Sequence, residues 1–392
     1  MIPFFRQPLQ WSEYTDLFQT ILESGRFIYG VYNKEFEKAF ALYCEAKACA
    51  AVNNGTSALR LMLKAAGIGP GDEVIIPDLT FAATIEAVLS VGAIPILADV
   101  MLTDLTLDYE SVLKNITRNT KAILTVLLYG QWGNLEVLSE IAQVKGLLLL
   151  VDAAQAQGVR KEQKTPLYWC DAAAYSFYPS KNLGAFGEAG AVVSNNEELI
   201  SKVRQLADHG QEEKNYSTRL GENARLSEIQ AAVLWHKLPA LDEANQHRRE
   251  CAKLYTALIN ASPVFFDLRE AYTVLGTLEP NFMAHYDHLK KIRFCPLLHD
   301  LETSVHHLYV VRVIGSSARL IKNRMAEKGI ECAFHYPYAL HHQSAFKINA
   351  HCATQLPVAD QIPAHLLSLP LYPDLTRDEA EFIMASLIEC GY

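Results

Sequence analysis

The sequence predicts an α/β fold in which helices cover a mostly parallel sheet of seven strands, followed by a smaller α+β domain. Seven short runs are apolar throughout, as expected of strands that are buried on both faces. Helix-like segments separate the earlier runs, which is the order of elements that a parallel sheet requires. With 392 residues, the chain is long enough for two domains.

The first domain is predicted to begin with an amphipathic segment at residues 11–24. One helix, at residues 57–66, is expected after the first strand, and another, at residues 135–144, after the fourth. The predicted strands are residues 48–52, 73–76, 94–98, 122–128, 147–151, 172–177 and 190–193.

The pattern changes near residue 240. A helix at residues 227–238 is followed by Pro239 and by a long charged helix at residues 241–258. Beyond it, the pattern predicts a strand at residues 307–314 and helices at residues 318–328 and from Arg377 onward. We therefore expect a large domain over residues 1–245 and a small C-terminal domain over residues 246–392.

Composition excludes several classes of protein. The 35 Lys and Arg against 44 Asp and Glu give a net charge of −9, which argues against nucleic acid as the main partner. No apolar run is long enough for a membrane span, and the amino terminus lacks the pattern of a secretion signal, so a cytoplasmic protein is expected. The eight cysteines contain no Cys-x-x-Cys pair, so we expect reduced, mostly buried thiols.

The first candidate site is an anion cradle where the first strand meets the following helix. Gly55 allows a tight turn, and Thr56 and Ser57 add hydroxyls beside the free N–H groups of the helix terminus. Such a cradle suits a phosphate. The alternative is that Asn54, Thr56 or Ser57 only caps the helix.

Two charged residues complete the constellation. Asp152 follows a buried strand, at the edge of the sheet where ligands bind in open α/β folds, and a carboxylate there calls for a cation nearby. Lys181 lies between a strand-like run and the glycine-rich residues 184–190, where a backbone can approach a ligand closely. The alternatives are that Asp152 caps the next helix and that Lys181 is a solvated surface charge.

A phosphate cradle, a carboxylate and a lysine in this order are the parts of a pyridoxal phosphate site. On these residues the chain resembles the DegT/DnrJ/EryC1/StrS family of sugar-nucleotide aminotransferases, within fold type I of the pyridoxal phosphate enzymes. The motifs that carry the resemblance are residues 54–59, 69–77, 80–84, 152–155, 176–184 and 223–232.

The resemblance implies a role for each residue of these motifs. Lys181 and Asp152 are the expected catalytic residues: Lys181 would form an imine with the cofactor aldehyde, and Asp152 would pair with its ring nitrogen. Asn223 would reach the phosphate of the neighbouring subunit, which implies a homodimer with shared active sites. The remaining cofactor contacts would come from Gly55, Thr56 and Ser57 at the phosphate, Phe81 stacking on the ring, Gln155 at the ring oxygen, Ser176 at the phosphate and Tyr178 near the site.

The family resemblance also implies the reaction. An amino group would pass from L-glutamate to a keto group of a dTDP-, UDP- or GDP-linked deoxyhexose, in polysaccharide or secondary-metabolite sugar biosynthesis. The segments at residues 209–211 and 335–337 favour carbon 3, and Lys181 favours aminotransfer because family members that dehydrate sugars have histidine there. The substrate candidates are Tyr29, Arg219, Arg225, His335 and Tyr336.

Other functions remain open at this point. The chain could be a non-catalytic regulatory or structural homologue that binds the cofactor, or another pyridoxal phosphate enzyme that modifies sugars. A nicotinamide dehydrogenase is disfavoured because no Gly-x-Gly-x-x-Gly follows the first strand. Ala189 and Glu222 depart from the commoner family pattern, and neither change removes a catalytic group.

Histidines are dense in the second half of the chain, yet the sequence predicts no metal site. The His-x-x-His spacing at His285 and His288 has no cysteine partner, and His341 and His342, being adjacent, are not expected to face one ion. We expect these histidines, with His299, His306 and His307, to flank the substrate mouth or to lie on the surface.

Overall fold

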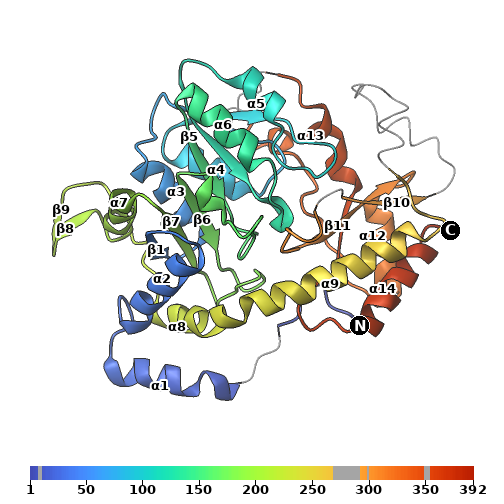
Figure 1. The fold of residues 1–392 in the computed structure, drawn as a ribbon, viewed down its shortest axis with the longest axis horizontal. Helices are drawn as coiled ribbons and strands as arrows, with labels where there is room; N and C mark the ends of the chain where they lie inside the picture. Colours follow the sequence, from blue (N-terminus) through green and yellow to red (C-terminus); the bar gives the residue numbers. More distant parts are fainter. Residues whose placement is uncertain (8–10, 268–291, 298–299, 348–353) are drawn as a thin grey trace.

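The computed structural model describes residues 1–7, 11–267, 292–297, 300–347 and 354–392. A large sheet with helices on both sides forms one part of the molecule, and a small sheet with its own helices forms the other (Figure 1). The long helix α9 (Leu241–Asn260) runs from the first part to the second (Figure 1).

The large sheet contains the seven predicted strands, in the spatial order β1-β7-β6-β5-β4-β2-β3. Only β7 runs against its neighbours: it pairs antiparallel with β1 and β6, whereas the other pairs are parallel. The prediction of a mostly parallel sheet is therefore confirmed. The strands are β1 (Ala48–Val52), β2 (Glu73–Pro77), β3 (Ile94–Ala98), β4 (Thr120–Val126), β5 (Leu148–Asp152), β6 (Ala172–Ser176) and β7 (Gly190–Ser194).

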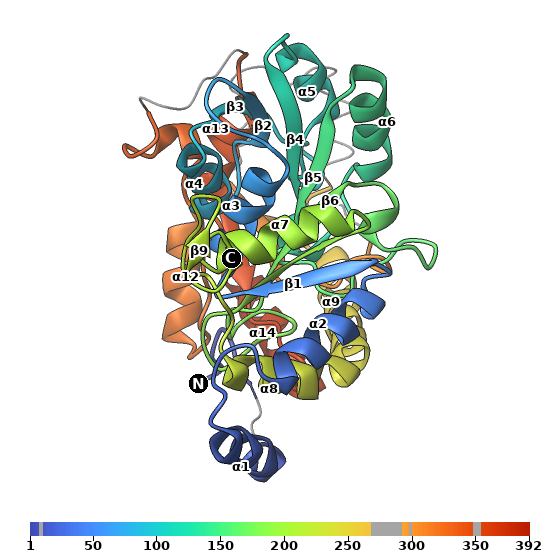
Figure 2. The ribbon, with the colours of Figure 1, turned by 90° about the vertical axis from the view of Figure 1, so that its left-hand side faces the viewer.

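Helices cover both faces of this sheet, because each strand buries side chains on both sides. Val74 and Ile76 of β2 belong to one core cluster, with α3, α4 and α7, whereas Ile75 belongs to the other, with α2, α6 and α8. Figure 2 shows α3 and α4 on one side of the strands and α6 on the other. The helices of this part are α1 (Thr15–Ser24), α2 (Val31–Tyr43), α3 (Gly55–Ala65), α4 (Ala82–Ser90), α5 (Tyr109–Asn115), α6 (Leu135–Lys145), α7 (Glu197–Ala207) and α8 (Glu228–Lys237).

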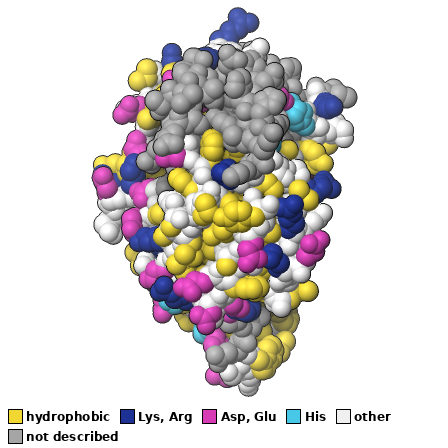
Figure 3. Space-filling model, turned by 90° about the vertical axis from the view of Figure 1, so that its right-hand side faces the viewer, with side chains coloured by type: hydrophobic (Ala, Val, Ile, Leu, Met, Phe, Trp, Pro, Cys, Tyr) yellow, Lys and Arg dark blue, Asp and Glu magenta, His cyan; other side chains and the backbone are white. Residues whose placement is uncertain are grey.

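The second part is built on an antiparallel sheet of three strands, β10 (Arg293–Pro296), β11 (Tyr309–Ile314) and β12 (Leu366–Leu369). A third core cluster packs this sheet against α9, α12 (Ala318–Glu327) and α14 (Arg377–Glu389). On the outer face of this part, acidic and basic side chains surround a group of hydrophobic ones (Figure 3). The short strands β8 (Gln211–Glu213) and β9 (Tyr216–Ser217) form a separate hairpin, and α13 (Pro357–Gln361) precedes β12.

Most element boundaries differ from the predicted ones by one or two residues. The strand expected at residues 307–314 begins only at Tyr309, because the backbone N–H of His307 donates to Tyr129 O, at 2.9 Å, instead of joining the sheet. The expected division at residue 245 falls inside α9 and stays a prediction.

The structure also bears on the composition-based expectations. Among the described residues, no helix combines the length and the apolar character that crossing a membrane requires. No disulfide joins the cysteines that the structure describes, and most of these cysteines are buried. His285, His288, His299 and Cys352 lie outside the described residues.

Candidate active site

A cavity of about 710 Å³ opens at the carboxyl ends of the parallel strands. The last residues of β4, β5 and β6 line it, together with residues that follow β1 and β2, as expected for an open α/β sheet. The structure brings most of the predicted site residues into its lining: Gly55, Thr56, Phe81, Asp152, Gln155, Ser176, Tyr178, Lys181, His335 and Tyr336.

The helix α3 begins at one end of the cavity. Asn54 is its N-cap, because the Asn54 side chain accepts a hydrogen bond of 2.7 Å from the N–H of Ser57. The capping role therefore falls to Asn54, while Thr56 lines the cavity. A Cβ atom on Gly55 would lie 2.7 Å from Cβ of Ser176, so only glycine lets the turn approach β6 this closely. The helix terminus and the Thr56 and Ser176 residues thus form a cradle for an anion.

Asp152 lies at the end of β5, almost fully buried. Its carboxylate accepts hydrogen bonds from Thr84 Oγ1, at 2.9 Å, and from Ala154 N, at 3.1 Å. Burial raises the pKa of Asp152, while these two hydrogen bonds and the charge of Lys181 act in the opposite direction. Turns follow Asp152 instead of a helix, so the alternative that it caps a helix is wrong.

Lys181 is not a surface lysine. Burial lowers its pKa to about 8, and the charge of Asp152 opposes this shift. The charge of Lys181 in turn contributes, after burial, to lowering the pKa of His335 to about 4 and of His307 well below its usual range. A lysine, a carboxylate and two neutral imidazoles therefore share one enclosed space.

The second half of the chain closes the cavity with His335 and Tyr336. Gln155 Nε2 donates to the Tyr336 hydroxyl at 2.9 Å, and Gln155 Oε1 accepts from Tyr129 N at 2.6 Å. The Tyr129 hydroxyl donates to the carbonyl oxygen of His335. The Phe81 ring lies 5.7 Å from that of Tyr336, centroid to centroid, and is half exposed toward the cavity. These contacts fix the position of the segment that carries His335 and Tyr336.

Sequence reasoning missed the roles of Thr84 and Tyr129, whereas His307, one of the histidines expected at the substrate mouth, does line the cavity. Thr84 belongs to the matching motif at residues 80–84, and its hydroxyl lies 3.0 Å from that of Thr80, which precedes α4. Tyr129 carries no such signal, because its contacts are to residues distant in the sequence.

Five predicted residues do not line the cavity of the single chain. Ser57 is buried, with its hydroxyl 3.5 Å from Arg60 Nη2. The side-chain oxygen of Asn223 accepts from Arg225, and Arg225 forms an ion pair with Asp208 at 3.1 Å. Tyr29 and Arg219 are exposed. Their contacts with cofactor or substrate stay predictions.

The residues present fit a pyridoxal phosphate group. The glycine-dependent cradle would accept a phosphate, and the buried carboxylate of Asp152 and the lysine of lowered pKa line the same cavity. This fold with this site defines a protein of the fold type I aminotransferase class. The chain belongs to the DegT/DnrJ/EryC1/StrS aminotransferase family, whose sequence model matches residues 10–275 and 279–388.

Curated relatives cover nearly the whole chain. A "Pleiotropic regulatory protein" of Geobacillus stearothermophilus is 35% identical over 94% of this chain and 92% of its own length. The dTDP-3-amino-3,4,6-trideoxy-alpha-D-glucose transaminase of Streptomyces venezuelae is 36% identical over 92% of this chain and 87% of its own. The UDP-2-acetamido-2-deoxy-3-oxo-D-glucuronate aminotransferase of Pseudomonas aeruginosa is 33% identical, over 94% and 93%.

Solved structures agree with the fold. The crystal structure of S. venezuelae DesV in complex with a ketimine intermediate is 34% identical, with a TM-score of 0.85, over 96% of this chain and 94% of that chain. That of Bacillus subtilis NtdA with bound cofactor PMP is 28% identical, with a TM-score of 0.81, over 97% and 82%. The family and these neighbours imply pyridoxal phosphate as the cofactor.

Proposed function

We propose that the protein transfers an amino group from L-glutamate to the C3 keto group of a dTDP- or UDP-linked deoxyhexose, with pyridoxal phosphate as its cofactor. The observation that carries the proposal is that the partly buried Lys181 and the buried Asp152 line one cavity, next to a helix terminus that suits a phosphate. Relatives named as transaminases of dTDP- and UDP-linked 3-amino or 3-oxo sugars support the substrate class.

Pyridoxal phosphate, when bound, supplies an electron sink that stabilises negative charge on a carbon next to nitrogen. Asp152 would hold a proton on the ring nitrogen, because a buried carboxylate favours a cation beside it. Thr84 and the Ala154 N–H keep the carboxylate oriented toward the cavity. Thr56, Ser176 and the first turn of α3 would bind the phosphate, and Phe81 would cover the ring.

Lys181 is suited to move the proton that the transfer requires. With a pKa of about 8, a large fraction of its amine is neutral at mildly basic pH and can accept a proton from carbon. The same amine, once protonated, can return the proton to the neighbouring carbon. The low pKa values of His307 and His335 keep these imidazoles neutral, so they can hydrogen-bond to a substrate without repelling Lys181.

We also propose that the protein acts as a homodimer. Large hydrophobic side chains are exposed around Asn223, the predicted inter-subunit residue, and around the substrate candidate Arg219, where a partner would cover them. They are Tyr29, Val31, Tyr216 and Leu220, which are 37%, 56%, 64% and 84% exposed in the single chain. In such a dimer, Asn223 would reach the cofactor phosphate of the neighbouring subunit, and Arg219 and Arg225 would supply cations for the nucleotide phosphates. The cytoplasmic location stays a prediction.

The test separates the two halves of the reaction. The purified protein with pyridoxal phosphate should show visible absorbance that glutamate bleaches, and the bleached protein should then aminate a keto sugar. A panel of dTDP- and UDP-linked 3-keto and 4-keto hexoses, with products identified by mass and by NMR, decides the position and the nucleotide.

Each outcome has a definite meaning. Bleaching by glutamate with amination of 3-keto sugars supports the proposal in full. Amination of 4-keto sugars alone would overturn the C3 assignment and leave the aminotransferase assignment intact. Visible absorbance without any bleaching by amino acids would favour a regulatory homologue, the function suggested by the name of the Geobacillus relative.

A further inference from the structure

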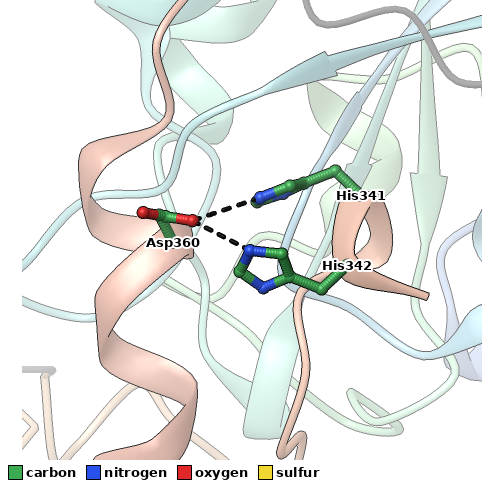
Figure 4. A group of neighbouring side chains, drawn as sticks. All are labelled: His341, His342 and Asp360. Carbon is green, nitrogen blue, oxygen red and sulfur yellow. Dashed lines mark hydrogen bonds and ion pairs between the residues drawn. The ribbon is translucent and has the colours of Figure 1, made fainter. Parts of the chain in front are cut away.

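Two adjacent histidines and an aspartate converge outside the cavity. His341 and His342 lie in a short 3-10 turn, Leu340–His342, and Asp360 lies in α13. Figure 4 shows both imidazole rings pointing toward the Asp360 carboxylate. The expectation that His341 and His342 would not face one point because they are adjacent in sequence is therefore wrong.

The distances suit a small metal ion. One potential ligand atom from each residue lies within 4.8 Å of the other two. Asp360 Oδ1 is 3.3 Å from His341 Nε2 and 2.9 Å from His342 Nε2. Tetrahedral zinc with bonds of about 2.0–2.1 Å holds its ligand atoms about 3.3 Å apart. The distances from Asp360 Oδ1 to the two imidazole nitrogens are therefore already close to those of a tetrahedral zinc site.

A buried carboxylate fixes the orientation of His341. Asp78 is fully buried, and its Oδ2 accepts from His341 Nδ1 at 2.5 Å, while its Oδ1 accepts from His341 N at 3.0 Å. With a proton on Nδ1, Nε2 of His341 faces Asp360 Oδ1 at 3.3 Å, and either a second ring proton or a metal cation would join these two atoms. Metal-binding histidines commonly donate their other N–H to a carboxylate in this way.

We propose that His341, His342 and Asp360 form a site for one Zn²⁺ ion, with water as the fourth ligand. Two imidazoles and one carboxylate are a ligand set that zinc accepts. His342 and Asp360 are partly exposed, so solvent can reach the fourth position.

The zinc would join segments that carry the active site. Asp78 directly follows β2 and precedes Phe81, and Leu340 N donates to Asp78 O at 2.8 Å. Residues 335–342 also carry His335 and Tyr336 into the cavity. Through its bond to Asp360, the ion would also link α13 to these two segments. None of the three ligands lines the cavity, so the role is structural and does not depend on the proposed reaction.

The test is a zinc titration of the tag-free holoenzyme after removal of metal with a chelator. We expect one tightly bound zinc per chain, measured with a competing fluorescent indicator and by elemental analysis. His342→Ala and Asp360→Asn should each weaken the affinity at least tenfold. His247→Ala is the matched control, because His247 is an exposed histidine on α9 and should leave zinc binding unchanged.

A second readout is the thermal midpoint. At one fixed zinc concentration, zinc should raise it for the wild type and for His247→Ala, and should raise it less for the two ligand variants. If the wild type binds no zinc tightly, or if all four proteins bind zinc with equal affinity, the proposed site is wrong. The contacts with Asp360 are then hydrogen-bonded ion pairs. Loss of zinc from His247→Ala alone would place the ion elsewhere and overturn the proposed site as well.

Discussion

Thr84 offers a test of how the protein holds Asp152. Thr84→Val keeps the shape of the side chain and removes the hydroxyl that donates to the buried carboxylate at 2.9 Å. A hydrogen bond to a charged group contributes about 1.5–3 kcal/mol, and each 1.36 kcal/mol is tenfold in rate. If the bond acts in the transition state, kcat/KM should fall by about 10- to 150-fold.

The pH profile distinguishes this role from general destabilisation. The hydrogen bond from Thr84 lowers the pKa of Asp152, so its removal raises that pKa. The carboxylate is then protonated at a higher pH than in the wild type, so the acidic limb of kcat/KM should move to higher pH. The assay is glutamate-dependent bleaching of the cofactor absorbance across pH.

Thr84→Ser is the matched control. It retains the hydroxyl and loses one methyl group, so both the rate and the acidic limb should stay near the wild type. A Thr84→Val protein with wild-type kcat/KM and an unshifted acidic limb would refute the idea that this hydroxyl maintains the carboxylate. Equal losses in Thr84→Val and Thr84→Ser would mean that packing, and not the hydrogen bond, accounts for the effect.

Four further predictions concern other residues. Lys181→Ala should fold and lose both the visible absorbance and all transfer, and wild-type turnover would disprove the lysine assignment. Asp152→Asn should bind some cofactor yet lose most of the rate; unchanged kinetics would contradict its role. Stopped-flow absorbance should show the metal-free apoenzyme reacting with pyridoxal phosphate faster as pH rises toward about 8 and levelling above it, because the neutral amine of Lys181 is the reacting form. Glu228→Ala leaves the N–H groups of Gly30, Tyr32 and Asn33 without their acceptor and should lower the free energy of unfolding by about 2–5 kcal/mol in urea titrations, against little change for exposed Glu243→Ala.

The strands and their burial could be predicted because their signal is local. Seven runs of apolar residues are recognisable in any short window, and both faces of β2 are buried as that pattern requires. Asp152 could be placed at the sheet edge because the residue after a buried parallel strand always lies there.

Some alternatives could be decided only by the neighbouring elements. The segment at residues 54–57 is both a cap and a ligand cradle: Asn54 caps α3, and Thr56 faces the cavity. Both residue types are common in either role, so composition could not divide the roles between them. The two roles are assigned by the packing of the turn against β6, which Gly55 allows to be close.

The amino-acid sequence by itself determined the α/β class, the order of strands along the chain and most of the residues that line the candidate cofactor cavity. Tertiary structure alone decided which distant residues meet. The hydrogen bond between His341 and Asp78 joins residues 263 positions apart, and the one between Gln155 and Tyr336 spans 181. Hydrophobic periodicity records only which face of an element is buried, whereas such pairings depend on how the two halves of the chain pack together.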